Sequence, residues 1–177
     1  MLSISDSFFW KEDLGMKEVK GSKSVEALLK EKKIYQIVNP KLVQAPPQIS
    51  IREAIRLMQT NKSGYIVIAK DKKVVGIITE TQVIQNVLEN EVDWSRPVAD
   101  FMVKDPLVLK MEDSVGQAID LMGLHRFYHI PLVDENGNLA NVLSVRTLIR
   151  FLAEFYPTEV YNLPPKPDQV METPEGG

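Results

Sequence analysis

The chain has 177 residues, of which 44% are hydrophobic and 25% are charged, and this composition is that of an ordinary soluble globular protein. Its 21 basic and 24 acidic residues give a net charge of −3, so we expect no general attraction to a nucleic acid polymer or to a membrane. The absence of cysteine excludes thiol catalysis, thiolate zinc sites and disulfides, and with no signal peptide or membrane-spanning apolar run it predicts a cytoplasmic protein.

The N-terminal segment, residues 1–33, combines an aromatic cluster with a short predicted helix. The cluster Phe8-Phe9-Trp10 is costly to leave in water, so we expect it to pack on the rest of the chain or on a second subunit. Residues 24–30 start with a serine, which is a good N-cap, and continue with apolar residues at helical spacing. This stretch therefore predicts a helix that leads into the next part of the chain.

The central feature of the sequence is an internal repeat with a spacing of 64 residues. Residues 50–58 recur as residues 114–122, and the identical positions are the serine cap and most of the apolar face: Ser50, Ala54, Ile55, Leu57 and Met58. Each copy therefore predicts an amphipathic helix with a serine N-cap. The correspondence extends upstream, where residues 34–38 match residues 98–102.

Two apolar runs of strand length follow each of these helices. In the first copy they are residues 66–68 and 74–79, and in the second copy they are residues 131–133 and 139–144. The Asn136-Gly137 pair in the second copy predicts a hairpin turn, because an Asn-Gly pair tolerates the positive φ that such turns need.

A second amphipathic helix ends each copy, and its apolar stripe predicts burial: Val83, Ile84, Val87 and Leu88 in the first, and Leu148, Ile149, Leu152 and Phe155 in the second. The predicted order in each copy is strand, helix, strand, strand, helix. Neither copy alone is large enough to bury both faces of its sheet, which favours two copies packed through their sheets. The predicted fold class is α+β, with two β-α-β-β-α units related by pseudo-twofold symmetry.

This pattern resembles the cystathionine-β-synthase (CBS) domain family, whose repeats nearly always come in pairs. The resemblance covers about residues 34–156, and three motifs carry it: His129-Ile130-Pro131-Leu132-Val133-Asp134, Gly76-Ile77-Ile78-Thr79 and Val98-Ala99-Asp100-Phe101-Met102. It implies four segments in chain order: an N-terminal extension at 1–33, CBS domain 1 at 34–94, CBS domain 2 at 95–156 and a proline-rich tail at 157–177.

Two hydroxyl residues stand where chemistry could take place. Thr79 and Ser144 each close a predicted strand and open a predicted helix, where a hydroxyl can cap free backbone N–H groups. The same location gathers amide donors and the positive end of the helix, which suits a phosphate. The two roles are compatible, and the sequence leaves both open.

The cleft that the resemblance implies departs from the family at the ribose position. Nucleotide-binding members usually carry an aspartate three residues after the hydroxyl, and this chain has Gln82 and Thr147 there. The loss weakens ribose binding, because hydrogen bonds to ionised groups contribute about 1.5–3 kcal/mol. Arg126, His129 and Arg146 lie on segments that converge on the cleft in the family and offer donors to a phosphate, although a solvated helix terminus explains either arginine as well.

Enzyme and metal signatures are weak. His125 and His129 have the spacing of a zinc-binding helix pair, but a helix is predicted to end near His125 and a strand to begin near Tyr128. We therefore expect no metal site. The sequence has no glycine-rich phosphate loop and no nucleophile elbow, so we expect no enzyme and no resident cofactor.

Two functions remain open. The first is a regulatory sensor that binds AMP, ADP, ATP or S-adenosylmethionine in the cleft through the following candidate residues: Thr79, Gln82, Arg126, His129, Ser144, Arg146 and Thr147. By resemblance the chain forms a homodimer, whose geometry the ligand shifts and a regulated protein partner reads. The second is a ligand-free dimerisation or docking module, motivated by the two missing aspartates, the aromatic cluster and the proline-rich tail.

Overall fold

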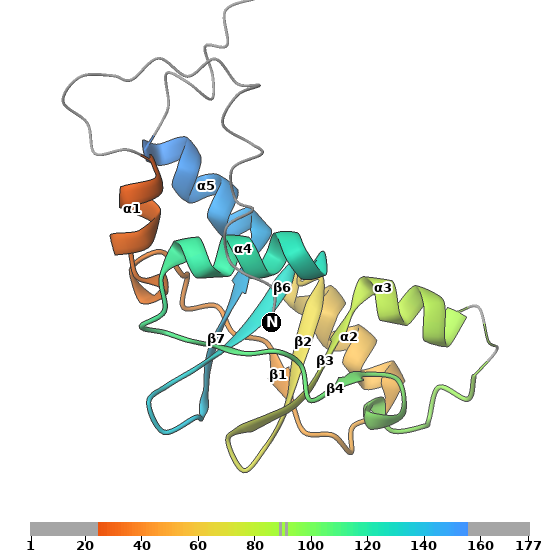
Figure 1. The fold of residues 1–177 in the computed structure, drawn as a ribbon. Helices are drawn as coiled ribbons and strands as arrows, with labels where there is room; N and C mark the ends of the chain where they lie inside the picture. The colour runs from red at the N-terminus through yellow and green to blue at the C-terminus, as the bar shows by residue number, and fades with distance from the viewer. Residues whose placement is uncertain (1–24, 89, 91, 156–177) are drawn as a thin grey trace, which may run out of the picture.

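The computed structural model describes residues 25–88, 90 and 92–155, and in this part the two copies form two similar α+β halves (Figure 1). The first half has a four-stranded sheet in the order β1-β2-β3-β4, and the second half has a three-stranded sheet in the order β5-β6-β7. The aromatic cluster and the proline-rich tail lie outside the described residues. Within the described ranges, no helix is long and apolar enough to cross a membrane.

The first copy follows the predicted order of elements. Its elements are β1 (Gln44–Ala45), α2 (Ile51–Asn61), β2 (Tyr65–Lys70), β3 (Lys73–Thr79), α3 (Glu80–Val83) and a π-helical turn η2 (Ile84–Leu88). β2 pairs with β1 in parallel and with β3 in antiparallel orientation. The sheet is completed by β4 (Val103–Lys104), which belongs to the connection between the copies and pairs with β3.

The second copy repeats this arrangement with a longer final helix. Its elements are β5 (Leu109–Lys110), α4 (Val115–His125), β6 (His129–Val133), β7 (Leu139–Ser144) and α5 (Val145–Phe155). Gly137 has a φ of +70° in the turn between β6 and β7, which confirms the predicted hairpin. The upstream runs at 34–38 and 98–102 form short 3₁₀ turns, η1 (Ile34–Gln36) and η3 (Val98–Asp100), rather than the leading strands.

Serine caps begin the first long helix of each copy, as the repeat predicts. The Ser50 hydroxyl accepts the backbone N–H of Glu53 at 3.2 Å, and the Glu53 carboxylate accepts the backbone N–H of Ser50 at 2.9 Å. Ser114 and Gln117 make the same pair of contacts in the second copy. These reciprocal bonds satisfy amide donors at each helix start and fix where the helices begin.

Each 3₁₀ turn packs into the core of the opposite half. Ile34, from the turn before the first copy, is fully buried in one cluster with Val115 and Ile130 of the second half. Val98, from the turn before the second copy, is fully buried in the cluster of the first half, which includes Ile51. The two copies are therefore exchanged at their beginnings, and neither core is complete without a segment of the other copy.

Matching backbone hydrogen bonds hold the two exchanged turns. The N–H of Ile34 donates to the carbonyl of Asp113 at 3.0 Å, and the N–H of Val98 donates to the carbonyl of Ile49 at 2.8 Å. The donors and the acceptors both correspond at the repeat spacing of 64 residues. The halves are thus related by pseudo-twofold symmetry, which confirms the predicted fold class.

The sheet faces that point away from the helices form the seam between the halves. Val67, Val133 and Val142 are buried but belong to neither helix-side core, because successive side chains of a strand point to opposite faces. The two hairpins lie side by side (Figure 1), and the N–H of Leu139 donates to the carbonyl of Lys72 at 2.7 Å.

The predicted N-terminal helix is present as α1 (Val25–Glu31), and it packs against α4 of the second half (Figure 1). The approach is close at Gly116, where an added Cβ would lie 3.4 Å from the backbone oxygen of Leu29. A small cavity of about 290 Å³ lies between Lys32, which follows α1, the end of the η1 turn and α5. The beginning and the end of the described chain therefore meet on the second half.

The exchange predicts that Ile34→Ala strongly destabilises the protein. Truncation of a fully buried isoleucine lowers the free energy of unfolding by about 2–5 kcal/mol. Tyr35→Ala is the matched control, because the Tyr35 side chain is 52% exposed and its loss should cost less than about 1 kcal/mol. Urea denaturation measures both values, and equal effects of the two substitutions would contradict the exchanged packing.

Candidate functional site

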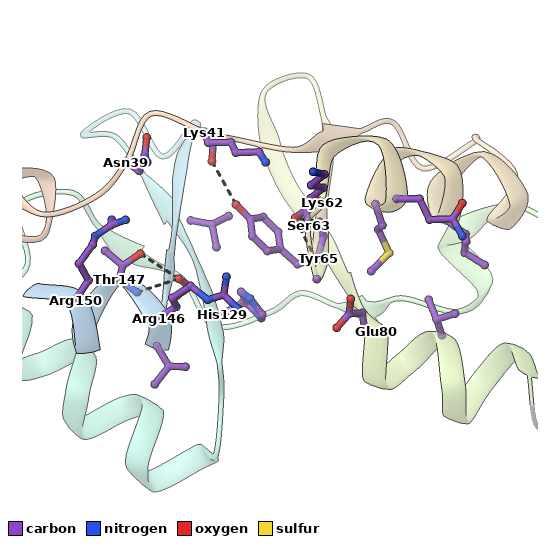
Figure 2. A pocket seen from close by; sticks show the side chains of 18 of the residues that line it. Asn39, Lys41, Lys62, Ser63, Tyr65, Glu80, His129, Arg146, Thr147 and Arg150 are labelled. Atoms are coloured by element: carbon purple, nitrogen blue, oxygen red, sulfur yellow. Dashed lines mark hydrogen bonds between the residues drawn. The ribbon is translucent and has the colours of Figure 1, made fainter.

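A groove with a volume of about 940 Å³ runs along the seam between the halves (Figure 2). One wall carries the end of β7 and the start of α5, and the other carries the end of α2 and the starts of β2 and α3. This volume suits a small-molecule ligand. Four basic side chains line the groove in the described part of the chain: Lys41, Lys62, Arg146 and Arg150. One acidic side chain, Glu80, lines it as well.

The second-copy wall is organised by Ser144, which ends β7 and caps α5. Its hydroxyl accepts the backbone N–H of Thr147 at 3.2 Å and lies 3.0 Å from the Thr147 hydroxyl. The predicted cap is therefore real at this position. Because each hydroxyl can both donate and accept, the pair keeps hydrogen-bonding capacity toward the groove.

The start of α5 offers donors to an anion. The N–H of Val145 donates to the carbonyl of Tyr128 at 3.0 Å, whereas the N–H of Arg146 has no acceptor among the described residues. Arg146 and Arg150 are four residues apart and lie on the same face of the helix. Neither guanidinium forms a hydrogen bond or ion pair within the described ranges. Two unpaired guanidinium groups beside a helix start form a favourable setting for a phosphate or carboxylate.

A buried asparagine holds the segment that closes one side of this wall. Asn141 on β7 is only 6% exposed, and its side-chain amide donates to the backbone carbonyl of Asn39 at 2.9 Å. Asn39 lines the groove together with Lys41. The hydrogen bond therefore fixes the position of the connecting segment relative to β7.

Tyr65 and His129 meet at the centre of the groove (Figure 2). They correspond at the repeat spacing, and their ring centroids lie 4.8 Å apart with an angle of 42° between the planes. Burial lowers the pKa of His129, and the nearby Glu80 carboxylate only partly offsets this effect. The imidazole is therefore neutral at pH 7 and offers one N–H donor rather than a positive charge. Burial likewise raises the pKa of the Tyr65 hydroxyl.

The first-copy wall differs from the second at the helix start. The backbone N–H of Thr79 donates to Oε1 of Gln82 at 3.2 Å, and the Thr79 hydroxyl donates to the same oxygen. These contacts engage the only acceptor of the Gln82 side chain that could hold a ribose hydroxyl.

The structure brings a part of the predicted site together. Four candidates line the groove: His129, Ser144, Arg146 and Thr147. Thr79 and Gln82 are not among the lining residues. Arg126 is also outside the groove, because it forms the exposed left-handed C-cap of α4 with a φ of 55°.

The groove residues that were not predicted include Tyr65, Glu80 and Arg150. The repeat spacing could have identified Tyr65, because it corresponds to His129. The i, i+4 spacing from Arg146 could have identified Arg150. No pattern in the sequence singles out Glu80.

The two histidines do not form a pair on one helix. His125 ends α4, and its ring stacks on Phe127 with centroids 5.2 Å apart, whereas His129 begins β6 and contacts Tyr65. The described part of the chain has no group of three or more His, Cys, Asp or Glu side chains that could hold a metal ion.

The repeat, the exchanged turns and the groove between the halves agree with a comparison to known protein families. A family model for the CBS domain matches residues 34–89 and 98–154. The chain belongs to the CBS-domain family. It carries two CBS domains in tandem, as the sequence motifs predict.

Two curated relatives cover most of the CBS pair. An uncharacterized 17.7 kDa protein of Acidianus ambivalens is 32% identical over 125 residues, which are 70% of this chain and 75% of that protein. The inosine-5'-monophosphate dehydrogenase of Methanocaldococcus jannaschii is 30% identical over 120 residues, which are 67% of this chain but 23% of that enzyme. The latter match is confined to the CBS region, so it carries no catalytic activity over to this chain. A CBS pair is typically a regulatory module.

Solved structures share the fold of the CBS pair. An uncharacterized conserved protein from Pyrococcus horikoshii has a TM-score of 0.64 and 25% identity, covering 70% of this chain and 93% of that one. A CBS domain protein from Pyrobaculum aerophilum, solved in complex with AMP, has a TM-score of 0.64 and 24% identity, covering 71% and 98%. The arrangement of the two halves is thus a shared property of CBS pairs.

The lowered pKa of His129 predicts a pH dependence of stability. The folded state binds this proton more weakly than the unfolded chain, so the free energy of unfolding is unaffected above the usual pKa of 6.5 and falls below it. We expect His129→Asn to lose less stability than the wild type between pH 7 and about pH 5.5.

The control is His125→Asn, which changes the other histidine of the chain at an exposed position. It separates the effect of the buried His129 from the loss of a histidine in general. Urea denaturation at both pH values measures the slopes, and a wild-type slope in His129→Asn would contradict the role of the buried imidazole.

Proposed function

We propose that this CBS pair is a regulatory sensor that binds an adenosine-containing ligand with an anionic group in the seam groove. The single observation that carries the proposal is the pair of unpaired guanidinium groups, Arg146 and Arg150, beside the start of α5. They favour a phosphate or carboxylate at this end of the groove. Ser144 and Thr147 supply hydroxyls next to them.

The rest of the second-copy wall is compatible with a nucleoside. Val142 and Val145 line the groove beside the hydroxyl pair and offer apolar surface to a base. Thr147 stands at the position where the family usually has a ribose-binding aspartate, and its short hydroxyl gives a weaker contact than a carboxylate. The proposal therefore includes a modest affinity for the ribose.

Two structural relatives support the choice of ligand class. The Pyrobaculum aerophilum protein was solved with AMP, and the CBS domain pair of protein MJ0100 was solved with 5'-methylthioadenosine and S-adenosyl-L-methionine. These ligands share an adenosine group. For this chain the candidates are AMP, ADP, ATP and S-adenosylmethionine.

One observation favours a second candidate function, a ligand-free dimerisation or docking module. In the first copy Thr79 and Gln82 bind each other, so their polar groups are already engaged. If the polar groups of the second copy were engaged in the same way, the groove would offer no contacts to a small ligand. The chain would then act only as a surface that binds proteins.

Calorimetric titration tests the sensor. We expect AMP to bind, and we expect Arg146→Ala and Arg150→Ala each to weaken the affinity about tenfold or more, because a hydrogen bond to a charged group contributes about 1.5–3 kcal/mol. Arg126→Gln removes the same charge outside the groove and should bind AMP as the wild type does. Absence of heat with all four ligands at millimolar concentration would reject the sensor and favour the docking module.

We also propose that two copies form a homodimer through the exposed apolar residues of η2 and α5. Ile84 and Leu88 in the η2 turn are 51% and 54% exposed, and Ile149 on α5 is 61% exposed. Part of the predicted apolar stripes is therefore solvent-accessible rather than buried in the chain. Ile84 and Ile149 occupy corresponding positions in the two copies, and such a pseudo-symmetric apolar face suits a second copy of the same chain.

The double substitution Ile84→Asp with Ile149→Asp should convert the dimer into a monomer, because two buried carboxylates per subunit are unfavourable in an apolar interface. Val108→Asp is the control, since Val108 is 38% exposed and lies in the connection before β5. Sedimentation velocity measures the mass of each variant. A monomeric wild type at high micromolar concentration would reject this pairing.

A further inference from the structure

Glu80 is the one carboxylate among the described residues that line the groove. Its backbone N–H donates to the carbonyl of Gly64 at 3.1 Å, and its carboxylate lies over the same glycine. An added Cβ on Gly64 would be 3.3 Å from Oε2 of Glu80, so the missing side chain leaves room for the carboxylate at the groove wall.

The corresponding residues of the second copy have no charge. The N–H of Val145 donates to the carbonyl of Tyr128 at 3.0 Å, in the same geometry as Glu80 and Gly64. Within the pseudo-symmetric frame, the first copy thus carries a carboxylate where the second carries a valine.

The basic residues show the opposite asymmetry. Arg146 and Arg150 of the second copy correspond to Thr81 and Gln85 of the first. The groove therefore has a basic end at the start of α5 and an acidic point at the start of α3, and its charges are not related by the symmetry of the fold.

Besides the two arginines, Lys41 and Lys62 also line the groove. His129 lies there as a neutral imidazole, because burial lowers its pKa, and the Glu80 carboxylate is close enough to influence it. Lys62 lies on the same wall of the groove as Glu80 (Figure 2). In the described part of the chain, no lysine or arginine forms an ion pair with Glu80.

We propose that Glu80 is a specificity-determining residue that limits how far the negative charge of a ligand extends from Arg146 and Arg150 toward the first copy. The inference rests on the proposed function and refines it: the groove selects a nucleoside monophosphate over the triphosphate. One phosphate is matched by the two guanidinium groups. Further phosphates extend toward an uncompensated carboxylate and are repelled.

A purely structural role for Glu80 makes a different prediction. An acidic residue in the first turn of a helix favours the helix by its interaction with the backbone dipoles. Its replacement would then change the melting temperature and leave the ratio of the two nucleotide affinities unchanged. The affinity ratio therefore separates the two roles.

The test is calorimetric titration of the full chain with AMP and with ATP in a magnesium-free buffer. We expect the wild type to bind AMP more tightly, and we expect Glu80→Gln to raise the affinity for ATP relative to AMP by about threefold to tenfold. Glu80→Val, which introduces the residue of the second copy, should act in the same direction. The effect should shrink as the salt concentration rises, because Glu80 is exposed and its field is screened.

Glu135→Gln is the matched control, since it removes the same charge in the exposed turn between β6 and β7. It should leave the ratio at the wild-type value. An unchanged ratio in both Glu80 variants, or a wild type that prefers ATP, would overturn the inference while AMP binding keeps the proposed function. If the wild type binds neither nucleotide, the proposed function fails and the inference fails with it.

Discussion

The exchange of Ile34 and Val98 between the halves is the constraint on which the groove depends. Each side chain is fully buried in the half that the other copy builds, so separation of the halves would return both to water. Burial of such a side chain contributes about 1.5–3 kcal/mol. The walls of the groove come from different halves, and their distance is therefore set by the same contacts that complete the two cores.

Local chemistry explains why the elements were predictable and the exchange was not. The caps at Ser50 and Ser114 and the turn at Gly137 depend on residues within three or four positions, and such patterns are visible in a sequence. The bond from Ile34 to Asp113 joins distant positions, and nothing in either segment reveals the other. The predicted stripe of the first copy fails where the π-helical turn exposes Ile84.

The candidate site shows the same difference between features set by nearby residues and contacts between distant positions. Ser144 was predictable because a strand end and a helix start are both local features, and its cap is present. Thr79 stands at the same junction, but its hydroxyl binds Gln82 across one helical turn, a choice that depends on the side chain three residues on. Arg126 follows α4 in an exposed left-handed conformation. The Glu80 carboxylate lies over Gly64, which is distant in sequence and leaves room for it.

Both boundaries of the described chain lie on one half of the molecule. α1 and α5 both pack on α4, so the first and last helices belong to the same half. A further domain attached at α1 and α5 would contact the second half directly. The first half would then lie farther from that domain. Any displacement that starts in the first half has to pass through the seam to reach either junction. A molecule bound along that seam would lie on the route of transmission.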